Sequence, residues 1–84
     1  MSVKIYTTPT CVYCKMAKEF FEKNNIQYEE HDVSSDGKAR EEMLQKSRQM
    51  GVPVIDVNGE IVVGFDRAHL AQLLGIEWPS ANGE

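Results

Sequence analysis

The sequence has few of the features that would place it in a membrane, on a nucleic acid or in a disulfide-rich scaffold. Of its 84 residues only two are cysteine, two histidine and one tryptophan. No apolar run approaches the roughly 20 residues that a transmembrane helix needs, and the N-terminal residues show no signal-peptide pattern. The net charge of −4 argues against a general nucleic-acid binder, because phosphate neutralisation needs clustered Lys and Arg. We therefore expect a cytoplasmic protein that binds neither membranes nor nucleic acids.

The length and composition predict one small domain over residues 1–84. A hydrophobic fraction of 42% and a charged fraction of 26% are ordinary for a soluble globular protein. The expected core covers about 3–75. Residues 76–84 include Pro79, Asn82 and Gly83 and are expected to form a frayed tail.

Cys11 and Cys14 are separated by two residues at the point where a helical pattern begins. Residues three apart lie on one face of a helix, with Cβ atoms about 5–6 Å apart, and a disulfide joins Cα atoms about 4.4–6.8 Å apart. In a cytosolic protein such a pair is more often catalytic or metal-binding than a static disulfide. The spacing favours a dithiol that cycles between reduced and oxidised forms over a structural disulfide or two buried thiols.

The two cysteines are expected to have different roles. Cys11, at the helix start, faces unpaired N–H groups and the positive end of the helix dipole, which favour the thiolate that attacks a disulfide. Lys15 and Lys18 are expected to add positive charge there. Cys14, one turn later and beside the apolar face, should stay protonated longer and then attack the mixed disulfide that Cys11 forms with a substrate.

Hydrophobic periodicity predicts seven elements in the order βαβαββα. The expected strands cover residues 3–7, 26–33, 54–57 and 60–63. The expected helices cover 11–25 and 36–49, with a last helix between an N-cap at Asp66 and Gly75. Thr8 or Thr10 is expected to cap the first helix, whose apolar positions are Val12, Met16, Ala17, Phe20 and Phe21.

This element order predicts an α/β fold. The first strand–helix–strand unit calls for a parallel pair, and Asn58-Gly59 is a strong signal for an antiparallel hairpin. The stop of the second helix is assigned to Gly51-Val52-Pro53. The four strands are expected to form one mixed sheet with helices on both faces.

Three motifs at these separations resemble the glutaredoxin family of thioredoxin-fold redoxins. They are Cys11-Val12-Tyr13-Cys14 after the first strand, Gly51-Val52-Pro53 before the third strand, and Gly64-Phe65-Asp66 before the last helix. The resemblance runs from Val3 to about Leu74. It implies a thioredoxin-like fold of the glutaredoxin type and a thiol–disulfide oxidoreductase that acts through Cys11 and Cys14.

The resemblance also implies a binding site beside the cysteines. Pro53 would follow a cis peptide bond, and Val52 would offer its backbone N–H and C=O to an extended substrate. Tyr13 would line the groove for the substrate thiol. Thr8 stands where the family usually has a Lys that pairs with a carboxylate of glutathione.

The family further implies that Gly64, Phe65 and Asp66 receive the γ-glutamyl end of glutathione through backbone donors and a helix N-terminus. A helix N-terminus is a good site for a carboxylate on physical grounds as well. Gln49 lies where glutaredoxins often place a Gln or Arg contact. For Tyr13 and Phe65, ordinary packing is an equally good interpretation.

Several positions depart from the family pattern. Besides Thr8, Gly51 replaces the usual Thr before Val-Pro, Val63 replaces the first Gly of a Gly-Gly pair, and Val12 replaces the Pro of the usual motif. A Val at this position occurs in the redoxins that serve ribonucleotide reductase and take electrons from thioredoxin reductase. The electron donor is therefore expected to be either glutathione, as a co-substrate, or thioredoxin reductase, with disulfide-containing proteins as substrates of a monomeric enzyme without a bound cofactor.

Two other classes of function remain open from the sequence. Some glutaredoxins hold an iron–sulfur cluster between two subunits with glutathione, and a redoxin fold can also serve only as a binding module. Structural zinc normally needs four ligands, and the spacing of Cys11, Cys14, His31 and His69 matches no common zinc pattern. No metal site built from this chain alone is expected.

Overall fold

The computed structural model describes residues 2–75, so the tail expected over 76–84 lies outside the described residues. The seven elements follow in the predicted order: β1 (Val3–Thr7), α1 (Val12–Lys23), β2 (Glu29–Asp32), α2 (Gly37–Ser47), β3 (Val54–Val57), β4 (Glu60–Val63) and α3 (Arg67–Leu74). Within this part of the chain, no helix is both long and apolar enough to cross a lipid bilayer.

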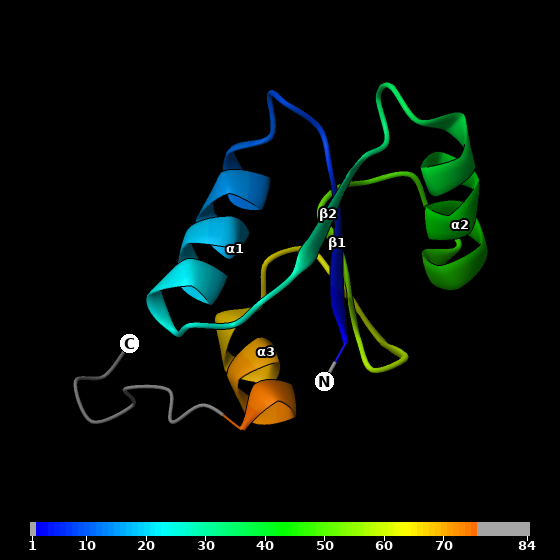
Figure 1. Ribbon diagram of the computed structural model, residues 1–84. Coiled ribbons are helices and arrows are strands. Elements are labelled where there is room, and N and C mark those ends of the chain that lie inside the picture. Colours follow the sequence, from blue (N-terminus) through cyan, green and yellow to red (C-terminus); the bar gives the residue numbers. More distant parts are fainter. Residues whose placement is uncertain (1, 76–84) are drawn as a thin grey trace.

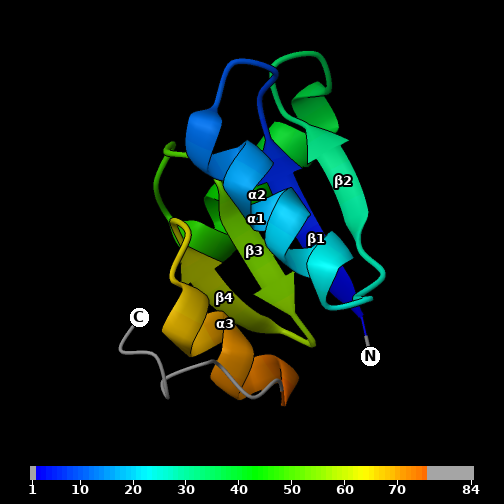
Figure 2. The same ribbon diagram turned by 90° about the vertical axis from the view of Figure 1, so that its left-hand side faces the viewer.

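The four strands form one mixed sheet in the order β2-β1-β3-β4. β1 runs parallel to β2 and antiparallel to β3, and β3 and β4 form the antiparallel hairpin. At the hairpin turn Asn58 and Gly59 have φ values of 52° and 94°, as a two-residue turn of this kind requires. α1 and α3 cover one face of the sheet and α2 covers the other (Figures 1 and 2). The predicted fold class is confirmed.

The core lies on both faces of the sheet because side chains alternate along each strand. Ile5 of β1 belongs to the larger cluster, which includes residues of α1 and α3, such as Phe21 and Leu70. Tyr6, the next residue, belongs to the smaller cluster with Met43 of α2. This central position of β1 fixes the loop that follows it, which carries Cys11.

A polar network fastens α2 to the sheet. The buried hydroxyl of Tyr6 donates to Glu42 Oε1 at 2.9 Å and accepts from Lys46 Nζ at 2.8 Å. Lys46 Nζ also bonds to Asp56 Oδ2 of β3 at 2.7 Å. Burial is the main cause that raises the pKa of Tyr6. The network links β1, α2 and β3 on the face away from α1.

Some element ends differ from the sequence prediction. β2 is shorter than the expected strand and lies at the sheet edge, where β1 is its one neighbour among residues 2–75. α2 ends at Ser47, because Arg48 adopts a left-handed conformation with φ 59°. The stop assigned to Gly51-Val52-Pro53 is therefore three residues too late, and residues 49–53 form a loop that leads into β3.

Two residues assigned to the apolar face of the first helix are exposed. Val12 is 69% and Met16 37% accessible, whereas Cys14 and Ala17 are buried. At 3.6 residues per turn, Val12 and Met16 lie about 160–200° around the helix from Cys14. The prediction grouped these residues because they are apolar. Their angular positions, however, place them on the side of α1 opposite to the sheet.

Candidate active site

Cys11 is the N-cap residue of α1. Its backbone is extended, with φ −88° and ψ 113°, and its Sγ accepts a hydrogen bond from the Cys14 N–H at 3.1 Å. The expectation that Thr8 or Thr10 caps the helix is wrong. A turn, in which the Thr8 carbonyl accepts from the Cys11 N–H at 3.3 Å, carries the chain past both threonines before the helix begins. The sulfur itself therefore faces the unpaired N–H groups of the helix.

Cys14 is a buried thiol, only 1% accessible. Burial, and then the hydrogen bond with Cys11, raise its pKa from 9.0 to about 12. The Thr8 backbone and the charge of Lys18 act in the opposite direction. This agrees with the expectation that Cys14 stays protonated. Both thiols are free, and the one nearer the surface is Cys11.

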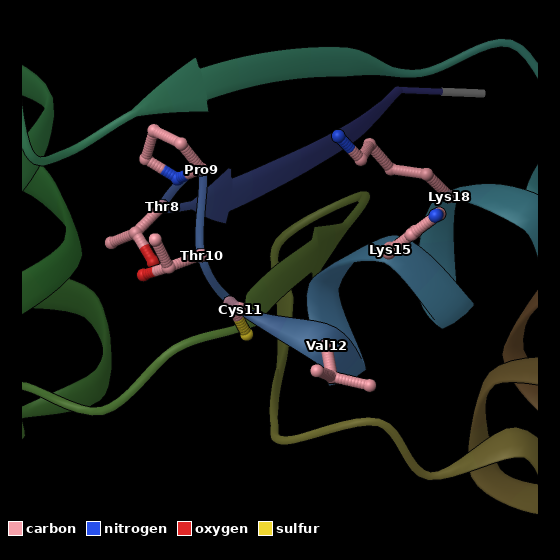
Figure 3. A pocket seen from close by; sticks show the side chains of 7 residues that line it. All are labelled: Thr8, Pro9, Thr10, Cys11, Val12, Lys15 and Lys18. Carbon is pink, nitrogen blue, oxygen red and sulfur yellow. The ribbon is translucent and has the colours of Figure 1, made fainter.

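A shallow pocket of about 290 Å³ opens beside Cys11 and is lined by Thr8, Pro9, Thr10, Cys11, Val12, Lys15 and Lys18 (Figure 3). Lys18 Nζ pairs with Glu30 Oε2 of β2 at 2.8 Å, and that oxygen also accepts from the Thr7 hydroxyl at 3.0 Å. The sulfur of Cys11 points away from both lysine ammonium groups (Figure 3). The two lysines thus line the pocket with basic side chains, but neither ammonium group contacts the sulfur of Cys11.

The second motif lies against the first. The Val52–Pro53 peptide bond is cis, as the resemblance implied, and Pro53 is buried directly before β3. Cys11 Sγ lies 3.8 Å from the Val52 carbonyl oxygen. The thiol of Cys11 thus touches the backbone that the family offers to an extended substrate.

The third motif joins the site through a backbone hydrogen bond. The Gly64 N–H donates to the Pro53 carbonyl at 2.8 Å, and Gly64 is in the left-handed region with φ 85°. Asp66 caps α3, since its Oδ1 accepts from the His69 N–H at 3.2 Å. The predicted N-cap is confirmed, while binding of glutathione by this segment stays a prediction.

The two aromatic candidates have different surroundings. The ring of Phe65 packs edge-on against Phe20 at 5.9 Å, and the Arg67 guanidinium lies 5.8 Å from its centre. This favours the packing interpretation for the Phe65 side chain. Tyr13, in contrast, is 62% exposed, so it does not serve the core.

Four exposed apolar side chains lie within or directly beside the three motifs in the sequence. Val12 and Tyr13 lie between the cysteines, Met50 precedes the Gly51-Val52-Pro53 motif, and Val63 precedes Gly64. Each is more than half exposed. We call these four residues the apolar rim.

Gln49 has an arrangement that the sequence did not predict. Its side-chain Oε1 accepts from the Gly51 N–H at 2.7 Å, and its Nε2 donates to the Gly51 carbonyl at 3.0 Å. The amide is thus engaged within its own loop. A Gln two residues before a Gly was the only signal available in the sequence.

The histidines do not converge on the cysteines. His31 stacks on Tyr6, with ring centres 5.4 Å apart, and its Nε2 contacts Glu29 at 3.3 Å. His69 lies on α3. Among residues 2–75 no group of three or more His, Cys, Asp or Glu side chains is placed to hold a metal ion. A cluster would need ligands from outside the part of the chain described.

Comparison with known proteins identifies the family. The model of the Glutaredoxin family matches residues 3–62, which includes Cys11, Cys14 and the Val52–Pro53 bond. The chain belongs to the glutaredoxin family. Glutaredoxin 3 of Escherichia coli K12 is 32% identical over 65 residues, which cover 77% of this chain and 78% of that protein.

Other relatives of this glutaredoxin-family protein are small redoxins. A glutaredoxin-like 8.6 kDa protein of unassigned function from a rubredoxin operon of Clostridium pasteurianum is 47% identical over 72 residues, 86% of this chain and 96% of its own length. The crystal structure of the thioredoxin-like protein BC3987 has a TM-score of 0.82 at 39% identity, covering 86% of this chain and 99% of that chain. The glutaredoxin-like NrdH-redoxin from Escherichia coli, which has a thioredoxin-like activity profile, has a TM-score of 0.78 at 25% identity, over 87% and 95% of the two chains.

Proposed function

We propose that this glutaredoxin-family protein reduces disulfides by a dithiol mechanism through Cys11 and Cys14. The observation that carries the proposal is the asymmetry of the two thiols. Cys11 is partly exposed and accepts an N–H hydrogen bond at the start of α1. Cys14 is buried, and its pKa is raised to about 12. In this mechanism Cys11 attacks the substrate disulfide, and Cys14 stays protonated until the mixed disulfide has formed.

The reaction proceeds in two exchanges. The Cys11 thiolate attacks one sulfur of the substrate disulfide, so that a mixed disulfide forms and the other substrate sulfur leaves as a thiolate that takes a proton. Cys14 then loses its proton and attacks Cys11 Sγ, which releases the second substrate thiol and leaves a Cys11–Cys14 disulfide. Two electrons pass to the substrate, and a reductant must return them.

Serine variants test this assignment. Cys14→Ser should accumulate a mixed disulfide on Cys11 with a protein disulfide substrate, whereas Cys11→Ser should form none. Mass spectrometry of acid-quenched reactions measures both species. A Cys11→Ser variant that reduces the substrate at the parent rate, or a trapped adduct on Cys14, would contradict the assignment.

For the reductant we propose a protein of the thioredoxin reductase class, with glutathione as the competing donor. The apolar rim supports this proposal. Its members, Val12, Tyr13, Met50 and Val63, are exposed large hydrophobic side chains within or beside the three motifs, and a protein donor that docks over these motifs would bury them. Glutathione, a small anion, would use little of the rim. The likeness to a redoxin with a thioredoxin-like activity profile points the same way.

The charges near Cys11 also favour a protein donor. Thr8 supplies no cation where the family usually has a Lys, and the amide of Gln49 is engaged by Gly51. Lys18 is paired with Glu30. Of the two lysines that line the pocket, Lys15 is the one that forms no ion pair within residues 2–75. A carboxylate of glutathione would therefore find one exposed lysine side chain with no partner in this part of the chain that fixes its position.

A paired turnover assay separates the two donors. The protein is supplied with a disulfide substrate and with either glutathione plus glutathione reductase or thioredoxin reductase, and NADPH oxidation is followed. Turnover only with thioredoxin reductase supports the proposal. Turnover only with glutathione would contradict it and would restore Thr8, Tyr13, Val52, Pro53, Gly64, Phe65 and Asp66 as a glutathione site.

A further inference from the structure

The loop between α2 and β3 contains a paired contact that the dithiol mechanism does not use. The side-chain amide of Gln49 forms two hydrogen bonds with one residue, accepting from the Gly51 N–H at 2.7 Å and donating to the Gly51 carbonyl at 3.0 Å. We call these two bonds the Gln49 clamp. Because an oxygen must face the N–H and a nitrogen the carbonyl, the pair also fixes which way the amide is turned.

The clamp requires glycine at position 51. A Cβ on Gly51 would lie 2.8 Å from Gln49 Oε1, closer than real Cβ contacts come. Any side chain there would push the amide away. Gln49 and Gly51 are therefore a matched pair, and Met50 between them is turned outward, 60% exposed.

The clamp determines the orientation of the next peptide unit. The Gly51 carbonyl and the Val52 N–H belong to one planar trans peptide, so they point in opposite directions. Because the Gly51 carbonyl oxygen points toward the Gln49 amide, the Val52 N–H points away from Gln49. Within the described residues no hydrogen bond engages that N–H. The Val52 carbonyl, at the other end of the residue, lies 3.8 Å from Cys11 Sγ.

We propose that Gln49 is a positioning residue, which presets the Val52 N–H to bond a main-chain carbonyl next to the substrate disulfide. This inference rests on the proposed function, because it concerns how Cys11 meets its substrate. It narrows the substrate class to disulfides carried on a peptide backbone. Gln49 acts through Gly51 and Val52 and touches no reacting atom.

The test compares two disulfides, one carried on a short peptide and one, bis(2-hydroxyethyl) disulfide, that has no peptide group. Single-turnover rates of reaction with the reduced protein are measured by quenched flow and mass spectrometry. Gln49→Ala should slow the peptide disulfide about five- to tenfold, the effect of losing one well-placed hydrogen bond. It should leave the hydroxyethyl disulfide within about twofold. Gln45→Ala, an exposed Gln on α2, is the matched control and should change neither rate.

Two further variants separate positioning from general damage to the loop. Gln49→Glu keeps an acceptor for the Gly51 N–H but loses the donor to its carbonyl, so it should resemble Gln49→Ala. Gly51→Ala should also slow the peptide disulfide, because its Cβ displaces the Gln49 amide. The double variant Gln49→Ala/Gly51→Ala should react no more slowly than either single variant, because both substitutions remove the same contact.

The outcomes are distinct. Slowing of the peptide disulfide alone supports the inference. Equal slowing of both disulfides, or no slowing of either, would overturn it while leaving the dithiol mechanism intact. If the parent protein reacts with neither disulfide, the proposed function itself fails.

Discussion

Replacing Cys11 should change stability as well as chemistry, because the reactive sulfur is also the cap of α1. Cys11 Sγ accepts the Cys14 N–H at 3.1 Å, one of the N–H groups that a helix start leaves without an intrahelical partner. Alanine at position 11 removes that acceptor, whereas serine keeps one of similar reach. The two variants should therefore differ in free energy of unfolding although both lack the thiol.

The size of the difference follows from the capping contact. Loss of a serine-type N-cap costs about 0.5–2 kcal/mol, and a thiol is a weaker acceptor than a hydroxyl, so Cys11→Ala should lose about 0.5–1 kcal/mol. In a domain of 60–100 residues, 1 kcal/mol corresponds to about 4–8 °C in Tm. Cys11→Ser should equal or exceed the stability of the parent, because serine is among the best capping residues.

Urea unfolding of the three proteins, all kept reduced with a phosphine, measures this order. The slope of the unfolding free energy against urea should be unchanged, so that the midpoints compare directly. We expect the order serine, parent, alanine from most to least stable. Equal destabilisation by serine and alanine would refute the reasoning, because the sulfur would then stabilise α1 by something other than accepting the Cys14 N–H.

Two further predictions concern buried hydroxyl and thiol groups. Because burial raises the pKa of Cys14 from 9.0 to about 12, its neutral form stabilises the fold below about pH 9, and this stability is lost as the pH rises toward about 12. Urea midpoints should fall less steeply above about pH 9 in Cys14→Ala than in the parent; parallel profiles would contradict this. Tyr6→Phe removes the hydroxyl that joins Glu42 and Lys46 and should cost about 1 kcal/mol in urea unfolding; an unchanged midpoint would show that the link contributes nothing.

Most of the fold could be predicted from the sequence, because its signals are local and agree with one another. The Asn58-Gly59 turn, the Asp66 cap and the left-handed Gly75 each follow from residue type alone. Where a helix ends was harder to predict. Arg48 adopts a positive φ, which no residue rule favours for arginine, so the end of α2 could not be read from the sequence.

The candidate site was predictable in its residues but not in its contacts. The spacing of Cys11 and Cys14 identified both thiols, and family resemblance supplied the cis bond at Pro53. The cap by a sulfur and the Gln49 clamp were not predictable, since each depends on where a loop places a side chain relative to a backbone group. Such contacts join residues two or three apart, yet their geometry depends on how each loop connects a helix to a strand of the sheet.

The failure of hydrophobic periodicity in α1 is informative about the site. Val12 and Met16 were grouped with the core because they are apolar, yet they lie on the side of the helix opposite to Cys14 and are exposed. Helix formation does not require an apolar residue at either position, and polar residues there would improve solubility. Local rules are expected to fail where function imposes a cost. The exposed Val12, next to Cys11 in the chain, is therefore consistent with the proposed protein donor, whose own apolar surface would cover this side chain where a small anionic thiol would leave it in water.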